Sequence, residues 1–178
     1  MTRMYSMKHG SKRQSDAGFL AYWKDELEKL SSEHILNWAV DSYSPRLVLK
    51  TAFEPEGCVI LSMLSKIVPK VSVLCNEIDF QMQRFLGVSK CFYMKTGLEI
   101  TPIYLHEMNN SRDLSFDAVL CGIRREGRPG IGVMGMDYFA ELPSIAPLVR
   151  WTREAVMNKL RRDSILDSSF INIWRADR

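Results

Sequence analysis

Two adjacent arginines follow a short apolar segment of the chain, and their side chains could bind an anion. The segment Ala118–Glu126 has the composition of a buried strand that continues through Gly122 into Arg124 and Arg125. A guanidinium carries a fixed charge and a planar fork of donors that fits phosphate or sulfate, and a glycine lets the backbone approach the same group. The pattern predicts an anion site at the end of a strand, although two solvated loop charges would give the same pattern.

A second stretch, Thr51–Gly57, joins a strand-like segment to a helix-forming one. The N–H groups and the dipole at the start of a helix favour a bound anion. Glu54 and Glu56 place two negative charges in the same stretch, and like charges repel at close range. From the residues alone, an anion-binding turn and a plain strand-to-helix turn are therefore both open.

The composition is that of an ordinary globular protein with one core. The chain has 178 residues, of which 46% are hydrophobic and 25% are charged. Its formal charge of +3 is too small to predict nucleic-acid binding, which needs a stronger and clustered basic surface. The four cysteines are far apart and form no metal-binding pair, so no metal is expected, and reduced thiols indicate an intracellular protein.

The first residues differ in composition from the rest of the chain. Residues 1–15 contain Arg3, Lys8, Lys12 and Arg13 but no acidic residue. This favours a flexible basic arm over residues 1–16, followed by a single domain over residues 17–178, with an organellar transit peptide as the alternative. No apolar run approaches the roughly 18 to 20 residues of a membrane span, so the sequence predicts a cytoplasmic protein without membrane contact.

Apolar periodicity predicts helices and strands that alternate along the chain. Helices are expected over residues 19–30, from Ser31 or Ser32 to residue 40, within residues 58–68, over residues 80–95 and from Thr152 onward. The helix over residues 80–95 is expected to be interrupted or bent near Gly87 and to be capped by Gly97. Strands are expected over residues 47–50, 71–75, 100–105 and 118–121, with a turn over residues 54–57 and irregular, glycine-rich chain over residues 127–135. This order predicts an α/β fold with a mostly parallel, twisted sheet of about five strands and helices on both faces. Ligands in such sheets bind beyond the carboxyl ends of the strands, which is where both candidate stretches begin.

Five segments in this order resemble the sulfonucleotide reductase family. They are Leu30–Ala39, Arg46–Phe53, Val71–Leu74, Gly122–Glu126 and Ile145–Thr152, and the fourth is the sharpest match. The family comprises the phosphoadenosine phosphosulfate and adenosine phosphosulfate reductases, within the adenine nucleotide alpha-hydrolase superfamily that also includes ATP pyrophosphatases. The resemblance covers about residues 27–165.

The resemblance implies an adenine nucleotide at the carboxyl edge of the sheet, as a ligand rather than as a permanently bound cofactor. ATP, adenosine phosphosulfate and phosphoadenosine phosphosulfate are the expected candidates. In the family the turn that corresponds to Thr51–Gly57 cradles the phosphosulfate, and the two arginines bind the anionic end. The binding residues expected by this resemblance are Thr51, Gly57, Gly122, Arg124 and Arg125, with Asn76 and Arg128 as weaker candidates.

Three departures from the family argue against an intact reductase. Glu54 replaces a loop glycine, and Cys75–Asp79 replaces a Leu-Asp-Thr-Gly segment that contacts the nucleoside. The sequence also has no cysteine after Cys121, whereas the reductases attack sulfur with a cysteine in a C-terminal Glu-Cys-Gly motif, and it lacks the cysteine pairs of an iron–sulfur cluster.

Two functions remain open from the sequence. One is an adenine-nucleotide-binding protein that acts at the nucleotide phosphate, as an ATP pyrophosphatase does, without reducing sulfur. The other is a non-catalytic homologue that serves as a partner subunit or scaffold, either in a homo-oligomer or with another protein. An ion pair from Glu54 to Arg124 or Arg125 would close the site and favour the second function.

Overall fold

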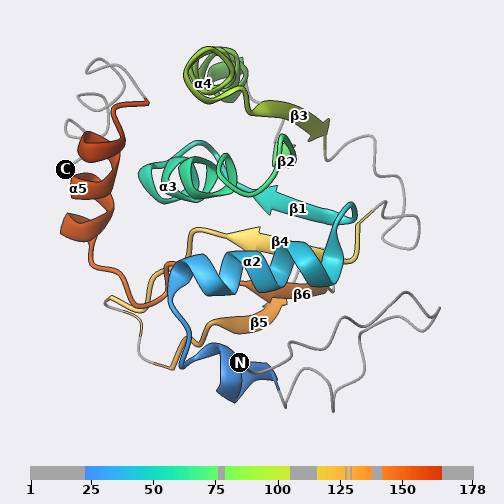
Figure 1. Cartoon of the computed structure of the whole chain (residues 1–178), viewed down its shortest axis with the longest axis vertical. Coiled ribbons are helices and arrows are strands. Elements are labelled where there is room, and N and C mark those ends of the chain that lie inside the picture. Colours follow the sequence, from blue (N-terminus) through green and yellow to red (C-terminus); the bar gives the residue numbers. More distant parts are fainter. Residues whose placement is uncertain are drawn as a thin grey trace.

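The computed structural model describes residues 23–75, 79–104, 116–126, 128, 130–137 and 142–165. Asn76 and the basic arm predicted over residues 1–16 lie outside these residues, so both stay predictions. Within the described residues the chain forms an α/β fold whose sheet is flanked by helices (Figure 1).

In the part of the chain that the structure describes, six strands form one sheet in the order β3-β2-β1-β4-β6-β5. Neighbouring strands run parallel, except that β5 is antiparallel to β6. The strands are β1 (Leu47–Lys50), β2 (Lys70–Cys75), β3 (Glu99–Tyr104), β4 (Ala118–Cys121), β5 (Met134–Asp137) and β6 (Leu142–Ile145). Lys50 pairs with Cys121, so β1 and β4 end side by side.

Local sequence signals set the ends of the helices. The helices are α2 (Ser32–Tyr43), α3 (Pro55–Leu64), α4 (Asp79–Thr96) and α5 (Arg153–Asp163). Ser31 and Thr152 cap α2 and α5, because each hydroxyl accepts a hydrogen bond from a backbone N–H of the first turn. Gly97 follows α4 with a φ of 76° and donates its N–H to the Tyr93 carbonyl, which confirms the predicted cap. None of the described helices is long and apolar enough to cross a membrane.

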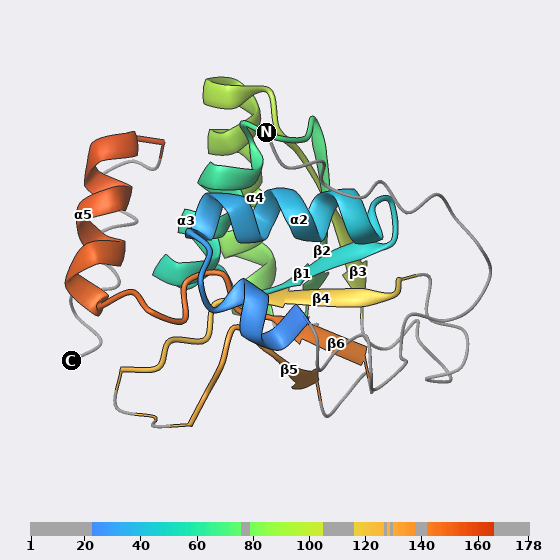
Figure 2. The same ribbon diagram turned by 60° about the horizontal axis from the view of Figure 1, so that its bottom comes forward.

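Helix α3 is the buried centre of the fold and begins earlier than the sequence predicted. It starts at Pro55 rather than near residue 58, because the fixed φ of proline suits the first turn of a helix. Gly57 therefore lies inside the first turn of α3 and not in a preceding turn. All residues from Gly57 to Leu64 are buried, and α5 packs beside α3 in both views of the ribbon (Figures 1 and 2).

Two strands at one edge of the sheet were not predicted. β5 overlaps the stretch over residues 127–135 that was expected to be irregular, and it forms because it pairs with β6. β6 contains Pro143, which lacks a backbone donor and masks the strand pattern. The sheet consequently has six strands, where about five were expected.

Helix α4 runs without interruption through Gly87, so the interruption that was one of the two predicted alternatives is wrong. A glycine inside a helix costs about 1 kcal/mol relative to alanine. Val88 and Phe92 are fully buried in the core, and burial of such side chains contributes about 1.5 to 3 kcal/mol each. The buried side chains thus outweigh the glycine.

Candidate functional site

The structure brings the two candidate stretches together at the carboxyl ends of β1 and β4. A Cβ at Gly122 would lie 2.7 Å from the Glu56 Cβ and 3.1 Å from the Glu54 Oε1. Only a glycine fits at this distance, so Gly122 allows the end of β4 to approach the start of α3. The predicted meeting point of Thr51–Gly57 and Gly122–Glu126 therefore exists.

The turn from β1 to α3, residues 51–54, has a fixed shape. Phe53 adopts a φ of 58°, in the left-handed region that few non-glycine residues enter, while its side chain is buried in the core. Its N–H donates to the Thr51 Oγ1 at 2.9 Å, and its carbonyl accepts from the Cys58 thiol at 3.6 Å. Anchoring of Phe53 therefore sets the path of the turn.

Glu54 directs its carboxylate back into this turn. The Thr51 hydroxyl and the Ala52 N–H both donate to the Glu54 Oε2, at 2.9 and 2.8 Å. Glu54 precedes α3 as its N-cap residue, yet its side chain makes no capping hydrogen bond to the helix. Thr51, which the resemblance assigned to a ligand anion, thus donates to a carboxylate of the chain itself, and so does the Ala52 N–H.

Gly57 is required by the chain itself. A Cβ at this position would lie 2.0 Å from the Thr51 Oγ1, so any other residue would displace Thr51 or α3. Gly57 therefore lets the first turn of α3 pack against the end of β1. A contact between Gly57 and a ligand stays a prediction.

Arg124 lies between two glutamates. Its Nε donates to the Glu56 Oε1 at 2.7 Å, and its Nη1 donates to the Glu126 Oε2. The Arg124 and Glu56 side chains are only 16% and 13% exposed. Glu126 also accepts the Arg153 N–H at 2.9 Å, and this bond, followed by the Arg124 contacts, lowers the pKa of Glu126. Arg124 thereby connects α3 with the start of α5.

The sequence did not identify Glu56 as the partner of Arg124. It raised the alternative of an ion pair between Glu54 and one of the arginines, and the pairing found is with the next glutamate along the chain. The signal available was an acidic residue directly before Gly57, but Glu56 and Arg124 are 68 positions apart in the sequence, so no local pattern shows the contact.

Arg125 has partners different from those of Arg124. Its Nε donates to the Ile131 carbonyl at 2.6 Å, and its guanidinium bonds both oxygens of Glu28 at 2.9 Å. Arg128 is exposed and donates its backbone N–H to the Arg125 carbonyl. Binding of a ligand by Arg125 or Arg128 stays a prediction.

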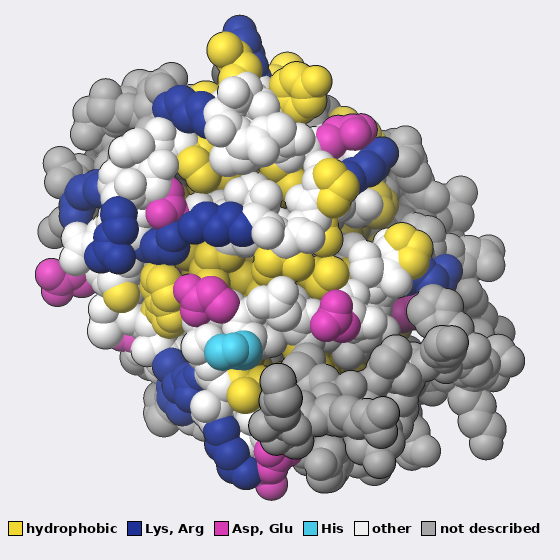
Figure 3. Space-filling model, viewed as in Figure 1, with side chains coloured by type: hydrophobic (Ala, Val, Ile, Leu, Met, Phe, Trp, Pro, Cys, Tyr) yellow, Lys and Arg dark blue, Asp and Glu magenta, His cyan; other side chains and the backbone are white. Residues whose placement is uncertain are grey.

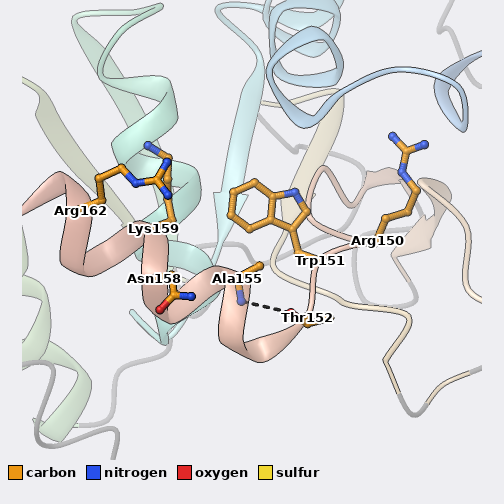
Figure 4. Close-up of a pocket in the computed structure, with 7 residues that line it drawn as sticks. All are labelled: Arg150, Trp151, Thr152, Ala155, Asn158, Lys159 and Arg162. Carbon is orange, nitrogen blue, oxygen red and sulfur yellow. Dashed lines mark hydrogen bonds between the residues drawn. The ribbon is translucent and has the colours of Figure 1, made fainter.

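A separate hollow of about 410 Å³ runs along α5 (Figure 4). It is lined by Arg150, Trp151, Thr152, Ala155, Asn158, Lys159 and Arg162, and contains none of the residues predicted from the sequence. Lys159 is bound to Asp163, and Arg150 bonds the carbonyls of Glu28 and Leu30. Lys and Arg side chains gather over this part of the surface (Figure 3). Lys159 and Arg150 are among the residues that line the hollow, and both make contacts within the protein.

Comparison with known proteins identifies relatives at the level of the whole domain. No protein-family model matches the chain. A phosphoadenosine 5′-phosphosulfate reductase of Gloeobacter violaceus is 27% identical over a match that covers 79% of this chain and 72% of that protein. An adenosine 5′-phosphosulfate reductase of Halalkalibacterium halodurans is 25% identical, with 73% and 70% covered. The chain is thus similar, over most of its length, to the phosphoadenosine phosphosulfate reductase-like proteins.

The fold of the chain agrees with that similarity. A crystal structure of phosphoadenylyl-sulfate reductase from Candida auris, in a phosphate complex, superposes with a TM-score of 0.65 and covers 89% of this chain and 92% of that one. At 18% identity this likeness shows the fold. Both curated relatives are named for the reduction of a sulfonucleotide, which places the reductase-like family in sulfur metabolism.

Proposed function

We propose that this reductase-like chain binds an adenine nucleotide across the carboxyl ends of β1 and β4, with the phosphate or sulfate end toward Thr51 and Arg124. The observation that carries the proposal is the convergence of the β1–α3 turn with Gly122 and Arg124 at one edge of the sheet. The Thr51 hydroxyl, the Ala52 N–H and a guanidinium together supply the kind of donors that bind oxyanions. The names of the curated relatives support an adenine nucleotide as the ligand.

Among the side chains that the structure describes, the thiols of Cys58 and Cys121 near this edge do not suit an attack on sulfur. Cys121 is buried at the end of β4, with its Sγ 3.3 Å from the Ser144 Oγ. Burial raises the pKa of the Cys121 thiol, which disfavours the thiolate that such an attack requires. Cys58 is also buried, and its thiol bonds the Phe53 carbonyl. The proposed chemistry is therefore at the nucleotide phosphate, as in an ATP pyrophosphatase, rather than reduction of sulfur.

A specific observation favours a second candidate, a non-catalytic partner subunit. Donors of the candidate site are bonded to carboxylates of the chain: Thr51 donates to Glu54, and Arg124 donates to Glu56. Helix α4 also exposes three large apolar side chains, those of Leu86, Tyr93 and Met94, which are 60%, 65% and 73% exposed. They lie on one side of α4, because residues seven and eight apart share a helix face. Light scattering and co-purification test this function, and a strictly monomeric protein that turns over a nucleotide would exclude it.

Calorimetric titration with ATP, adenosine phosphosulfate and phosphoadenosine phosphosulfate tests nucleotide binding. We expect Arg124→Ala to weaken binding by about tenfold, because a charge-assisted contact contributes on the order of 1.5 kcal/mol. Arg161→Ala is the matched control, since Arg161 is exposed on α5 and its guanidinium donates to the Asn158 side chain, outside the proposed site. Circular dichroism confirms that each variant is folded.

Two results would contradict the proposal. If none of the three nucleotides binds the parent protein or its variants, the function is wrong. If Arg124→Ala binds as tightly as the parent while a nucleotide does bind, the assignment of Arg124 to the site is wrong.

A further inference from the structure

The carboxylate of Glu54 occupies the position that the proposed function gives to the ligand anion. Its Oε2 accepts the Thr51 hydroxyl at 2.9 Å and the Ala52 N–H at 2.8 Å. Its Oε1 faces the two glycines, 3.3 Å from the Cβ position of Gly57 and 3.1 Å from that of Gly122. One carboxylate thus fills the gap between the end of β1, the start of α3 and the end of β4.

Glu54 is not needed there as a helix cap. A residue before a helix ordinarily accepts a bond from an N–H of the first turn, and the Glu54 side chain makes no such bond to α3. Its carboxylate instead accepts from donors of the turn, as a phosphate or sulfate oxygen would.

The turn has contacts that do not involve the Glu54 side chain. The buried ring of Phe53 anchors the turn, and the Phe53 N–H bonds the Thr51 Oγ1 independently of Glu54. Ala52 is exposed and Glu54 is half-buried, so the carboxylate can move into solvent while the Ala52 N–H stays in place.

We propose that Glu54 is an autoinhibitory residue whose carboxylate competes with the phosphate or sulfate of the nucleotide for Thr51 and Ala52. This inference rests on the proposed function and adds its regulation. A ligand must displace the Glu54 carboxylate before its anionic end can bind the turn. Removal of that carboxylate therefore strengthens binding of the anion but leaves the contacts of the adenosine unchanged.

The test compares the parent protein with Glu54→Ala and Glu54→Gln by calorimetric titration. The probes are inorganic sulfate, adenosine phosphosulfate and adenosine, all at constant ionic strength. We expect Glu54→Ala to bind sulfate and adenosine phosphosulfate about tenfold more tightly than the parent, and adenosine equally well. Glu54→Gln keeps the size of the side chain and loses its charge, so it gains affinity in the same direction.

Glu33→Ala is the matched control, because it removes one carboxylate from the exposed first turn of α2. It should bind every probe as the parent does. Repeating the titrations at about 0.3 M KCl separates direct competition from long-range repulsion, because salt screens the second effect and not the first. The ratio of parent to Glu54→Ala dissociation constants should persist.

The outcomes separate the failure of this inference from the failure of the proposed function. If Glu54→Ala binds sulfate more tightly but no nucleotide binds any variant, Glu54 does occupy an anion site and nucleotide binding is wrong. If adenosine phosphosulfate binds the parent as tightly as it binds folded Glu54→Ala and Glu54→Gln, Glu54 is not inhibitory although the proposed function stands. Loss of the ratio in salt would also overturn the inference.

Discussion

The hydroxyl of Tyr43 is buried at the end of α2 and lacks a hydrogen-bond partner among the described residues. A buried polar group without a partner is unfavourable, because it has lost its bond to water. Burial, together with the charge of Asp117, raises the pKa of Tyr43 to about 12 from the ordinary value of 10.0. The residue therefore resists ionisation in the folded state more than in the unfolded state.

We expect Tyr43→Phe to keep or raise stability at neutral pH, by up to about 1 kcal/mol, because it removes the unpaired hydroxyl and keeps the ring. In the parent the folded pKa exceeds the unfolded one, so stability is intact below pH 10.0 and is lost as the pH rises through about 12. The variant should not show this part of the alkaline loss. Urea unfolding at neutral and alkaline pH measures both effects.

Tyr93→Phe is the matched control, because Tyr93 is 65% exposed on α4. It should change neither the neutral stability nor the alkaline profile. A loss of stability on Tyr43→Phe at neutral pH would mean that the hydroxyl is satisfied in solution.

At the level of single residues, the sequence could place the site but not its internal contacts. Thr51 and Gly122 were predicted to meet because each follows a strand, and strand order along the chain fixes where the ends lie. The partner of Arg124 is Glu56, and the partner of Thr51 is Glu54. These pairings depend on side-chain directions in three dimensions, which no local pattern of residue types contains.

Helices α3 and α5 are joined by a polar bridge within an otherwise apolar contact. The Ser62 hydroxyl, buried in α3, donates to Asp163 at the end of α5, and Lys159 donates to both oxygens of Asp163 at 2.6 and 2.8 Å. Burial alone would raise the pKa of Asp163, but the bonds from Lys159 and Ser62 lower it on balance. The carboxylate is thus charged and paired on both sides.

We expect Asp163→Asn to destabilise the protein by about 2 kcal/mol, because the change leaves the half-buried Lys159 ammonium without its counter-charge. The midpoint of urea unfolding measures the effect. Asp41→Asn, on an exposed position of α2, is the control and should stay within about 0.5 kcal/mol of the parent. Equal midpoints for the two variants would show that the bridge adds nothing to the apolar packing of α3 on α5.

Among the elements, those with local signals were predicted and those that depend on distant partners were not. The helix ends could be predicted from residues close to them, namely the capping residues Ser31 and Thr152 and the glycine after α4. β5 and β6 have four residues each, and they are strands because β6 pairs with β4 and β5 pairs with β6. Continuity of α4 through Gly87 likewise follows from core packing rather than from intrinsic propensity.

For the molecule as a whole, Glu28 joins three segments that are distant in sequence. Its carboxylate binds the Arg125 guanidinium and accepts the Val133 N–H at 2.7 Å, while its carbonyl accepts from Arg150. A Cβ at Gly132 would lie 2.9 Å from the Glu28 Oε1, so this glycine permits the close approach. Burial raises the pKa of Glu28, but the bonds from Val133 and Arg125 lower it overall.

We expect Glu28→Gln to lower the free energy of unfolding at neutral pH by about 1 kcal/mol, because the partly exposed ion pair and one backbone bond are weakened. The folded pKa lies below 4.5, so in the parent this contribution is present above pH 4.5 and is lost as the pH falls through the folded value. The stabilities of parent and variant should therefore converge in acid. Urea unfolding as a function of pH measures the difference.

Glu26→Gln tests the same change two residues away, where the carboxylate is 45% exposed and pairs with Lys29. An exposed pair of this kind contributes little, so this variant should follow the parent at every pH. If Glu28→Gln also follows the parent, the Glu28–Arg125 pair does not support the fold, and the Arg125 guanidinium becomes available for a ligand. If the difference is found and disappears in acid, Arg125 serves the tertiary structure, and Arg124 is left as the arginine to test first against nucleotides.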